Sequence, residues 1–249
     1  MPQKDGKSKR QQIREKRRRE RQRGRLVSIG LIAIGAVILA GLFIYPNLKP
    51  VEFVAITPGA YPQADMNTMG DPNAPVKLEV WEDFQCPACK NFSSNTEPLL
   101  IENYVATGKV YYVLHHFPFI DDGATGRESD QAANASMCAA EQGHFWNYKE
   151  ILAANWDGEN LGSFTDRRLT AFADSLGLDM GRFRRCFDAN TYKDQIEQDY
   201  NDGLALGVHS TPSIFVDGVF VEYPGDPRLV PAYEHIAAAI EAALAALDQ

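Results

Sequence analysis

Residues that commonly bind metal ions are scarce in this sequence, which has only four cysteines and five histidines in 249 residues. Cys86 and Cys89 form a Cys-x-x-Cys motif, whereas Cys138 and Cys186 stand alone, 48 positions apart. A zinc ribbon needs a second close pair of Cys or His ligands. We therefore expect no metal or other cofactor, although the motif by itself also fits half of a zinc site or a static clip.

Residues 26–45 lack charged side chains altogether. Twenty helical residues cover roughly 30 Å, the thickness of the hydrocarbon layer of a bilayer. The preceding residues 1–25 contain twelve Lys or Arg and three acids, and basic segments stay on the cytoplasmic side. The sequence therefore predicts a basic cytoplasmic tail (1–25) and one membrane-spanning helix (26–45), with the rest of the chain outside.

A cleaved signal peptide is the alternative for this segment. Its apolar region usually has 7–15 residues and ends at a small-residue cleavage site. The sequence that follows, Pro46-Asn47-Leu48-Lys49-Pro50, has no such pattern. Nucleic-acid binding by the tail is possible in principle, but membrane topology already explains its charges.

Basic residues are few after the apolar segment. Residues 26–249 contain 13 bases and 30 acids, a net charge of about −17. Such a domain has no general attraction for nucleic acid, which we do not expect as a partner. Residues 46–73 are rich in Pro, Gly and Asn and are predicted to be a linker, and residues 74–249 are long enough for one domain.

The order of patterns along this domain predicts an α/β fold. A strand over 76–84, a helix over 90–104 and a strand over 110–116 form a parallel unit. Helical patterns over 127–206 interrupt the strands. Short strands at 214–216 and 219–221 flank Asp217-Gly218, which favours a hairpin, and an alanine-rich helix covers 231–247. This order indicates a thioredoxin fold with an inserted helical subdomain.

The motif Cys86-Pro87-Ala88-Cys89 stands between the first strand and the first helix. The free N–H groups and positive dipole end of a helix N-terminus favour a thiolate. Pro87 is tolerated there because its missing N–H would have no partner inside the helix. The position predicts redox chemistry.

Four motifs extend this interpretation: Glu82 to Cys89 (EDFQCPAC), His116-Phe117-Pro118, Ala139 to Trp146 (AAEQGHFW) and Gly207 to Ser213 (GVHSTPS). In this order they resemble the DsbA-like thiol-disulfide oxidoreductases, over about residues 66–245. The resemblance implies that Cys86 is the exposed attacking sulfur and Cys89 the buried resolving sulfur. It also implies that Thr211-Pro212 is a cis-proline loop whose backbone pairs with an extended substrate, rather than an ordinary turn.

Three acids precede the motif, and any of them could relay protons to Cys89: Glu79, Glu82 and Asp83. The alternative is that Glu82 and Asp83 are simply solvated at the strand end. Many members of the resembled family have an acid six positions before the first cysteine, where this chain has Val80, and Glu79 is one residue further away.

Cys138 and Cys186 lie in the predicted insertion. Outside the membrane an even number of cysteines favours pairing, so a second, structural disulfide is expected, and some members of the resembled family carry such a pair. Two buried free thiols are the alternative.

These observations predict a single-pass membrane protein whose extracytoplasmic domain forms disulfides in exported proteins and is recycled by a membrane redox partner. We expect a monomer. A reductase or isomerase stays open because Pro87-Ala88 lacks the histidine of strongly oxidising members and threonine precedes Pro212. The other alternative is a non-catalytic binding module or chaperone.

Overall fold

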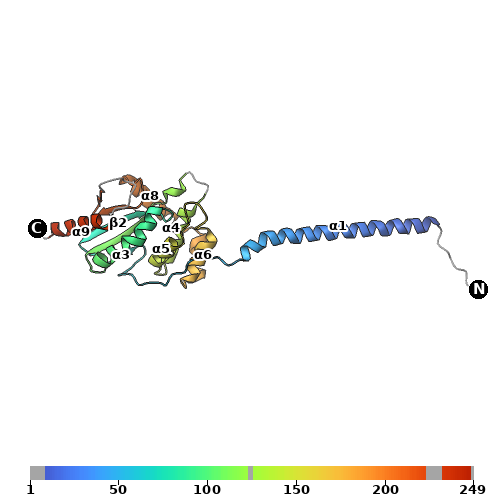
Figure 1. The fold of residues 1–249 in the computed structure, drawn as a ribbon, viewed down its shortest axis with the longest axis horizontal. Helices are drawn as coiled ribbons and strands as arrows, with labels where there is room; N and C mark the ends of the chain where they lie inside the picture. Colours follow the sequence, from blue (N-terminus) through green and yellow to red (C-terminus); the bar gives the residue numbers. More distant parts are fainter. Residues whose placement is uncertain (1–8, 123–125, 223–231, 248–249) are drawn as a thin grey trace, which may run out of the picture. The chain divides into compact units, whose positions relative to one another are not determined.

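The computed structural model describes residues 9–122, 126–222 and 232–247. The chain divides into two units, Met1–Pro50 and Val51–Gln249. Helix α1 (Lys9–Leu48) forms the first unit (Figure 1). Its segment Gln12–Leu42 has the length and hydropathy of a membrane span. The helix begins before the predicted 26–45 because its N-terminal part is rich in Arg, Lys, Glu and Gln, which are good helix formers.

A five-stranded sheet in the order β1-β3-β2-β4-β5 is the centre of the second unit. The strands β2 and β3 are parallel, and the other neighbouring pairs are antiparallel. The sheet consists of β1 (Thr68–Met69), β2 (Val76–Glu82), β3 (Val110–His116), β4 (Ser213–Val216) and β5 (Val219–Phe220). This arrangement agrees with the predicted parallel unit and terminal hairpin.

Helices cover both faces of the sheet. One face packs against α2 (Pro87–Asn95), α3 (Glu97–Leu100), the π-helical turn Ile101–Val105 and α9 (Tyr233–Leu247). The other face includes Trp81 and packs against α8 (Lys193–Ala205). Gly203 allows this close approach, because a Cβ there would lie 2.8 Å from the Trp81 ring.

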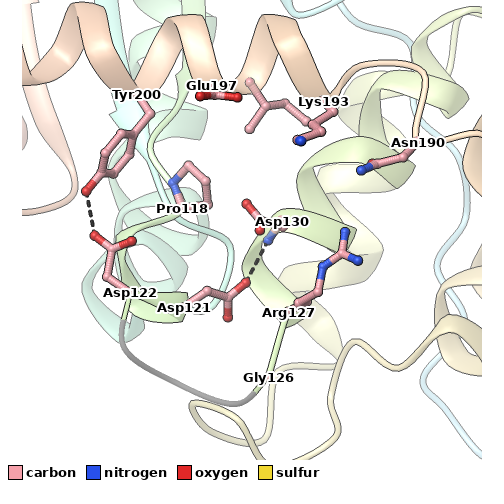
Figure 2. A pocket seen from close by; sticks show the side chains of 11 residues that line it. Pro118, Asp121, Asp122, Gly126, Arg127, Asp130, Asn190, Lys193, Glu197 and Tyr200 are labelled. Carbon is pink, nitrogen blue, oxygen red and sulfur yellow. Dashed lines mark hydrogen bonds between the residues drawn. The ribbon is translucent and has the colours of Figure 1, made fainter.

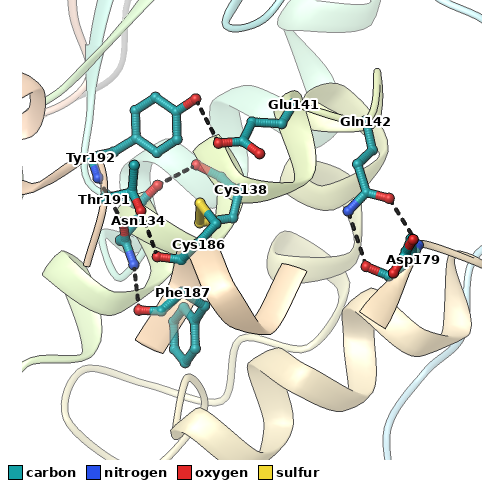
Figure 3. Close-up of a disulfide and its surroundings, with 11 residues drawn as sticks. Asn134, Cys138, Glu141, Gln142, Asp179, Cys186, Phe187, Thr191 and Tyr192 are labelled. Carbon is teal, nitrogen blue, oxygen red and sulfur yellow. Dashed lines mark hydrogen bonds between the residues drawn. A yellow bond between two sulfur atoms is a disulfide. The ribbon is translucent and has the colours of Figure 1, made fainter. Parts of the chain in front are cut away.

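The inserted subdomain lies between β3 and β4 in sequence. A 3-10 turn (Phe119–Asp121) precedes its helices, which are α4 (Glu128–Ala140), α5 (Phe145–Ala154), α6 (Asp166–Ser175), α7 (Met180–Asp188) and α8. The helices α4 to α7 enclose an apolar core of their own. Within this core a disulfide links Cys138 of α4 to Cys186 of α7 (Figure 3).

The prediction that residues 46–73 form a linker is wrong for most of that segment. Residues from Val51 onward belong to the folded domain, and β1 pairs with β3. The ring of Phe53 packs edge-on against Phe172, and Asn155 exchanges two hydrogen bonds with the backbone of Val54. These contacts join residues about 100 positions apart, so local composition could not reveal them.

Candidate functional site

The two cysteines of the Cys-x-x-Cys motif lie at the beginning of α2. Cys86 is the N-cap residue and Pro87 the first helical residue. The Cys86 carbonyl accepts the backbone N–H of Lys90 at 3.0 Å, which is the first bond of the helix. Both sulfurs are free thiols in this structure. The motif thus occupies the position that the sequence predicted.

The Cys86 side chain is less accessible than expected. Only 6% of Cys86 is exposed, against 2% of Cys89, so the prediction of an exposed attacking sulfur is wrong. The loop that contains Thr211 contributes to this cover: the peptide bond between Thr211 and Pro212 is cis, and the Cys86 thiol donates to the Thr211 carbonyl at 3.2 Å. A substrate must therefore approach where this loop meets α2.

The two thiols differ in acidity. A hydrogen bond from the Cys89 thiol, together with the N–H groups of Ala88 and Cys89, lowers the pKa of Cys86 to about 6, although burial opposes this. Burial raises the pKa of Cys89 well above its ordinary value, and the neighbouring Cys86 adds to this effect. Near neutral pH the pair therefore holds one thiolate, on Cys86, and one proton, on Cys89.

The candidate acids Glu79 and Glu82 lie on opposite faces of β2. Side chains alternate along a strand, so Glu82 shares a face with Leu78 and Val80, beneath α2. Glu79 shares the other face with Trp81, and its carboxylate binds His115 at 3.2 Å and Lys77 at 2.7 Å. The bond from His115 is the main reason that the pKa of Glu79 falls to about 2.

Glu82 is buried and not solvated, contrary to the simpler expectation from sequence. Burial raises its pKa to about 8, and the charge of Glu82 in turn contributes to the raised pKa of Cys89. The Nζ atom of Lys149 lies 3.3 Å from one carboxyl oxygen. No hydrogen bond of good geometry reaches either oxygen within the described part of the chain. This carboxyl group is therefore suited to hold a proton beside Cys89.

Lys149 and Glu97 complete a buried cluster with Glu82. The Lys149 Nζ donates to both oxygens of Glu97 at 2.6 Å, and Tyr112 donates to the same carboxylate. Burial disfavours the Lys149 charge, but Glu82 and Glu97 together raise its pKa above the ordinary value. Lys149 therefore stays charged, and its hydrogen bonds go to Glu97 and Ser93, not to Glu82.

Asp83 is also buried, at the end of β2. One oxygen accepts the Gln85 N–H at 2.8 Å and the Ser129 hydroxyl at 2.7 Å, and the other accepts the Ile120 N–H at 3.0 Å. Burial raises the pKa of Asp83 to about 7 despite these bonds. Its contacts hold the turn before Cys86 against α4.

Sequence reasoning missed Lys149, Glu97 and Gln85. Lys149 follows Phe145 by four positions and therefore lies on the same face of α5. The sequence signal that could have identified Lys149 was a single lysine on an otherwise apolar helix face. Gln85 gave no such signal, because its contacts with Asp121 and Ser129 join residues 36 and 44 positions away.

A cavity of about 400 Å³ lies between α8 and the beginning of α4 (Figure 2). Its wall includes Asp121, whose carboxylate accepts the Gln85 side chain and the Asp130 N–H. Both acidic and basic side chains line the cavity. Neither Cys86 nor Cys89 is among its lining residues. The cavity is therefore separate from the two thiols.

Comparisons with known proteins agree with this geometry. A family model described as thioredoxin matches residues 63–241. A probable disulfide bond formation protein D of Bacillus anthracis is 27% identical over 199 residues, which cover 78% of this chain and 88% of that protein. Oxidised BdbD from Bacillus subtilis has the same fold, with a TM-score of 0.62, 24% identity and coverage of 78% of this chain and 100% of that one. Chlamydia trachomatis DsbA gives a TM-score of 0.60 and 23% identity, with 80% and 98% covered.

Proposed function

Because this chain belongs to the thioredoxin family and is a DsbA-like thiol-disulfide oxidoreductase, we propose that it forms disulfides in exported proteins while anchored to the membrane by α1. The observation that carries the oxidising direction is the low pKa of Cys86 beside the high pKa of Cys89. A stabilised thiolate favours the reduced enzyme, so the oxidised enzyme takes electrons readily. The name of the Bacillus anthracis relative supports the same direction.

The reaction begins with the Cys86–Cys89 disulfide. A substrate thiolate attacks the Cys86 sulfur, the enzyme's S–S bond breaks, and its electron pair goes to Cys89. The second substrate thiolate then attacks the substrate sulfur of the mixed disulfide, and Cys86 leaves as a thiolate. The substrate loses two electrons, and the enzyme gains them as one thiolate and one thiol.

The proton for Cys89 comes from Glu82. The Cys89 sulfur has a raised pKa and needs a proton as soon as it leaves the disulfide. Glu82 holds one near neutral pH, and Lys149 stabilises the carboxylate that remains. Glu82 would take the proton back when a membrane partner reoxidises the pair.

Thr211 binds the substrate backbone beside Cys86. When Cys86 is protonated, its thiol donates to the Thr211 carbonyl. The thiolate and disulfide forms of Cys86 have no such proton to donate. The carbonyl is then available to an N–H group of an extended substrate, which pairs as an added strand.

Topology follows from the charges around α1. The basic residues of its first part stay in the cytoplasm, and the apolar part lies in the bilayer. The acidic domain that begins at Val51 is then outside, where its substrates are newly exported chains with cysteine pairs. A membrane-impermeant thiol label should reach Cys86 in reduced intact cells, and labelling only after lysis would contradict this topology.

Two serine variants test the roles of the cysteines. Cys86→Ser should abolish exchange with a dithiol substrate. Cys89→Ser should keep the attacking sulfur and accumulate mixed disulfides that do not resolve, visible as adducts on non-reducing gels. Adducts with Cys86→Ser alone would reverse the two roles, and a redox titration in glutathione mixtures measures the direction.

A further inference from the structure

Gln85, the residue before Cys86, is fully buried and connects several parts of the fold. Its side-chain amide group donates to Asp121 at 3.0 Å and to Ser129 at 2.9 Å. Its backbone N–H donates to Asp83 at 2.8 Å. These bonds use the donors of Gln85 and fix the orientation of its amide, so that the side-chain oxygen and the backbone carbonyl face other partners.

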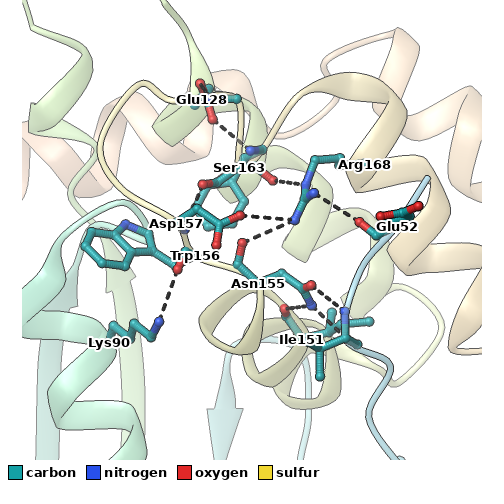
Figure 4. Close-up of polar contacts among 12 residues, drawn as sticks. Glu52, Lys90, Glu128, Ile151, Asn155, Trp156, Asp157, Ser163 and Arg168 are labelled. Atoms are coloured by element: carbon teal, nitrogen blue, oxygen red, sulfur yellow. Dashed lines mark hydrogen bonds and ion pairs between the residues drawn. The ribbon is translucent and has the colours of Figure 1, made fainter. Parts of the chain in front are cut away.

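Both remaining acceptors of Gln85 bind the loop between α5 and α6. The Trp156 indole donates to the Gln85 carbonyl at 2.6 Å, and the Asn160 N–H donates to the Gln85 side-chain oxygen at 2.6 Å. Lys90 of α2 adds a bond to the Trp156 carbonyl at 3.1 Å and lies over the Trp156 ring (Figure 4). The residues on both sides of the Cys86-to-Cys89 motif therefore hold this loop.

The far end of the loop is held by Glu128 at the beginning of α4. Its two carboxylate oxygens accept the N–H groups of Gly162 and Phe164, at 2.8 and 2.7 Å. Asn160 and Gly162 both have positive φ angles, 54° and 86°. The backbone N–H groups on either side of Leu161 are therefore both hydrogen-bonded, which fixes the backbone at Leu161.

Leu161 is 73% exposed, more than any other large apolar side chain of the described part of Val51–Gln249. A single exposed leucine is ordinary in itself. The loop that contains this leucine is bonded, through Trp156 and Asn160, to Gln85, the residue before Cys86. A substrate cysteine bonded to Cys86 has neighbours only about 3.3 Å per residue away along an extended chain. The loop is attached to the residues that flank the motif, Gln85 and Lys90, so it is a candidate for contact with the residues beside such a cysteine.

We propose that Leu161 is a specificity residue that contacts an apolar side chain flanking the reacting cysteine of the substrate, and that Gln85 is the positioning residue that holds it there. The inference rests on the proposed function. Such an apolar neighbour is typical of chain segments that become buried on folding, which are exposed in newly exported proteins before their disulfides form. Leu161 would thus favour unfolded substrates over folded ones.

The test compares the full-length protein with a Leu161→Ser variant, both in detergent micelles. The substrates are two dithiol peptides that differ only in a Leu or a Ser beside the first cysteine. The wild type should prefer the Leu peptide, and Leu161→Ser should lower kcat/KM for that peptide about fivefold to tenfold, through KM, because a partly buried leucine contact is lost. Rates with the Ser peptide and with a small dithiol should not change.

Matched variants separate this contact from general effects. Leu99→Ser changes a leucine on α3 that is 41% exposed, and it should leave the preference intact, as should the conservative Leu161→Met. Asn160→Pro removes the N–H that binds Gln85 and excludes the positive φ, so it should reduce the preference as Leu161→Ser does. Asn160→Gly keeps both features and should retain the preference.

The outcomes distinguish the inference from the proposed function. Equal use of both peptides by the wild type, or an unchanged preference in Leu161→Ser, would overturn the role of Leu161 while leaving the oxidase intact. Failure of the wild-type protein to oxidise either peptide would instead overturn the proposed function.

Discussion

The two pairs of cysteines have opposite surroundings. Cys86 and Cys89 are three residues apart, at a helix N-terminus beside a buried carboxyl group, and both are free thiols. Cys138 and Cys186 are 48 residues apart, lie among apolar side chains and are joined in a disulfide. Cysteine therefore has two different roles in this protein. The surroundings of Cys86 stabilise a thiolate, whereas the apolar surroundings of Cys138 and Cys186 do not.

The largest expected difference between the pairs is in reduction. The stabilised Cys86 thiolate should make the Cys86–Cys89 disulfide easier to reduce than Cys138–Cys186 by about 100 mV or more, which is over a thousandfold in the equilibrium constant. Mild dithiol treatment, alkylation and peptide mass mapping should modify Cys86 first. Simultaneous alkylation of all four cysteines, or free Cys138 and Cys186 before any reductant is added, would contradict the comparison.

Removing the Cys138–Cys186 disulfide should lower the stability of the fold without changing thiol-disulfide exchange at Cys86. The double variant Cys138→Ala with Cys186→Ala opens a cross-link of about fifty residues, which should lower the free energy of unfolding by about 2–4 kcal/mol. Thermal unfolding of the oxidised protein measures the loss. Exchange rates at Cys86 should stay near those of the wild type at temperatures where the variant is folded. A large loss of exchange in the folded variant would give this pair a role in the reaction.

The acids of β2 allow a matched test of the first pair. Glu82→Gln keeps the size of the side chain but cannot pass a proton, so turnover should fall about a hundredfold. Glu79→Gln on the opposite face should change turnover less than about twofold, because its carboxylate binds His115 and Lys77 instead. Stopped-flow oxidation of a dithiol peptide measures both. Equal effects of the two variants would exclude Glu82 as a relay.

The smallest expected effect is a flat response of Cys86 to pH above neutrality. With a pKa of about 6, Cys86 in the reduced protein should be about nine-tenths thiolate at pH 7. Its alkylation rate should rise about tenfold from pH 5 to 7 but only about 10% from pH 7 to 8, where an ordinary thiol still gains severalfold. A profile that keeps rising above pH 8 would show that the thiolate is not stabilised.

Much of the fold followed from local patterns in the sequence. The apolar run before Cys86, the Asp217-Gly218 hairpin and the uncharged segment 26–45 each depend on residues close together in the chain. The position of Cys86 at a helix N-terminus is local in the same way, because a strand, a Cys-Pro pair and a helix follow one another directly. These signals were sufficient to predict the strands β2 to β5, the insertion and the redox motif, but not β1.

Tertiary structure alone decided the surroundings of the motif. The position of Glu82, not Glu79, beneath α2 depended on which face of β2 meets α2, and the raised pKa of Glu82 depended on its burial. The attachment of the Trp156 loop to Gln85 spans 71 positions, and that of Val54 to Asn155 spans 101. Sequence determined which groups are present and which local elements they form, whereas burial and long-range contacts, which set pKa and orientation, exist only once the chain has folded.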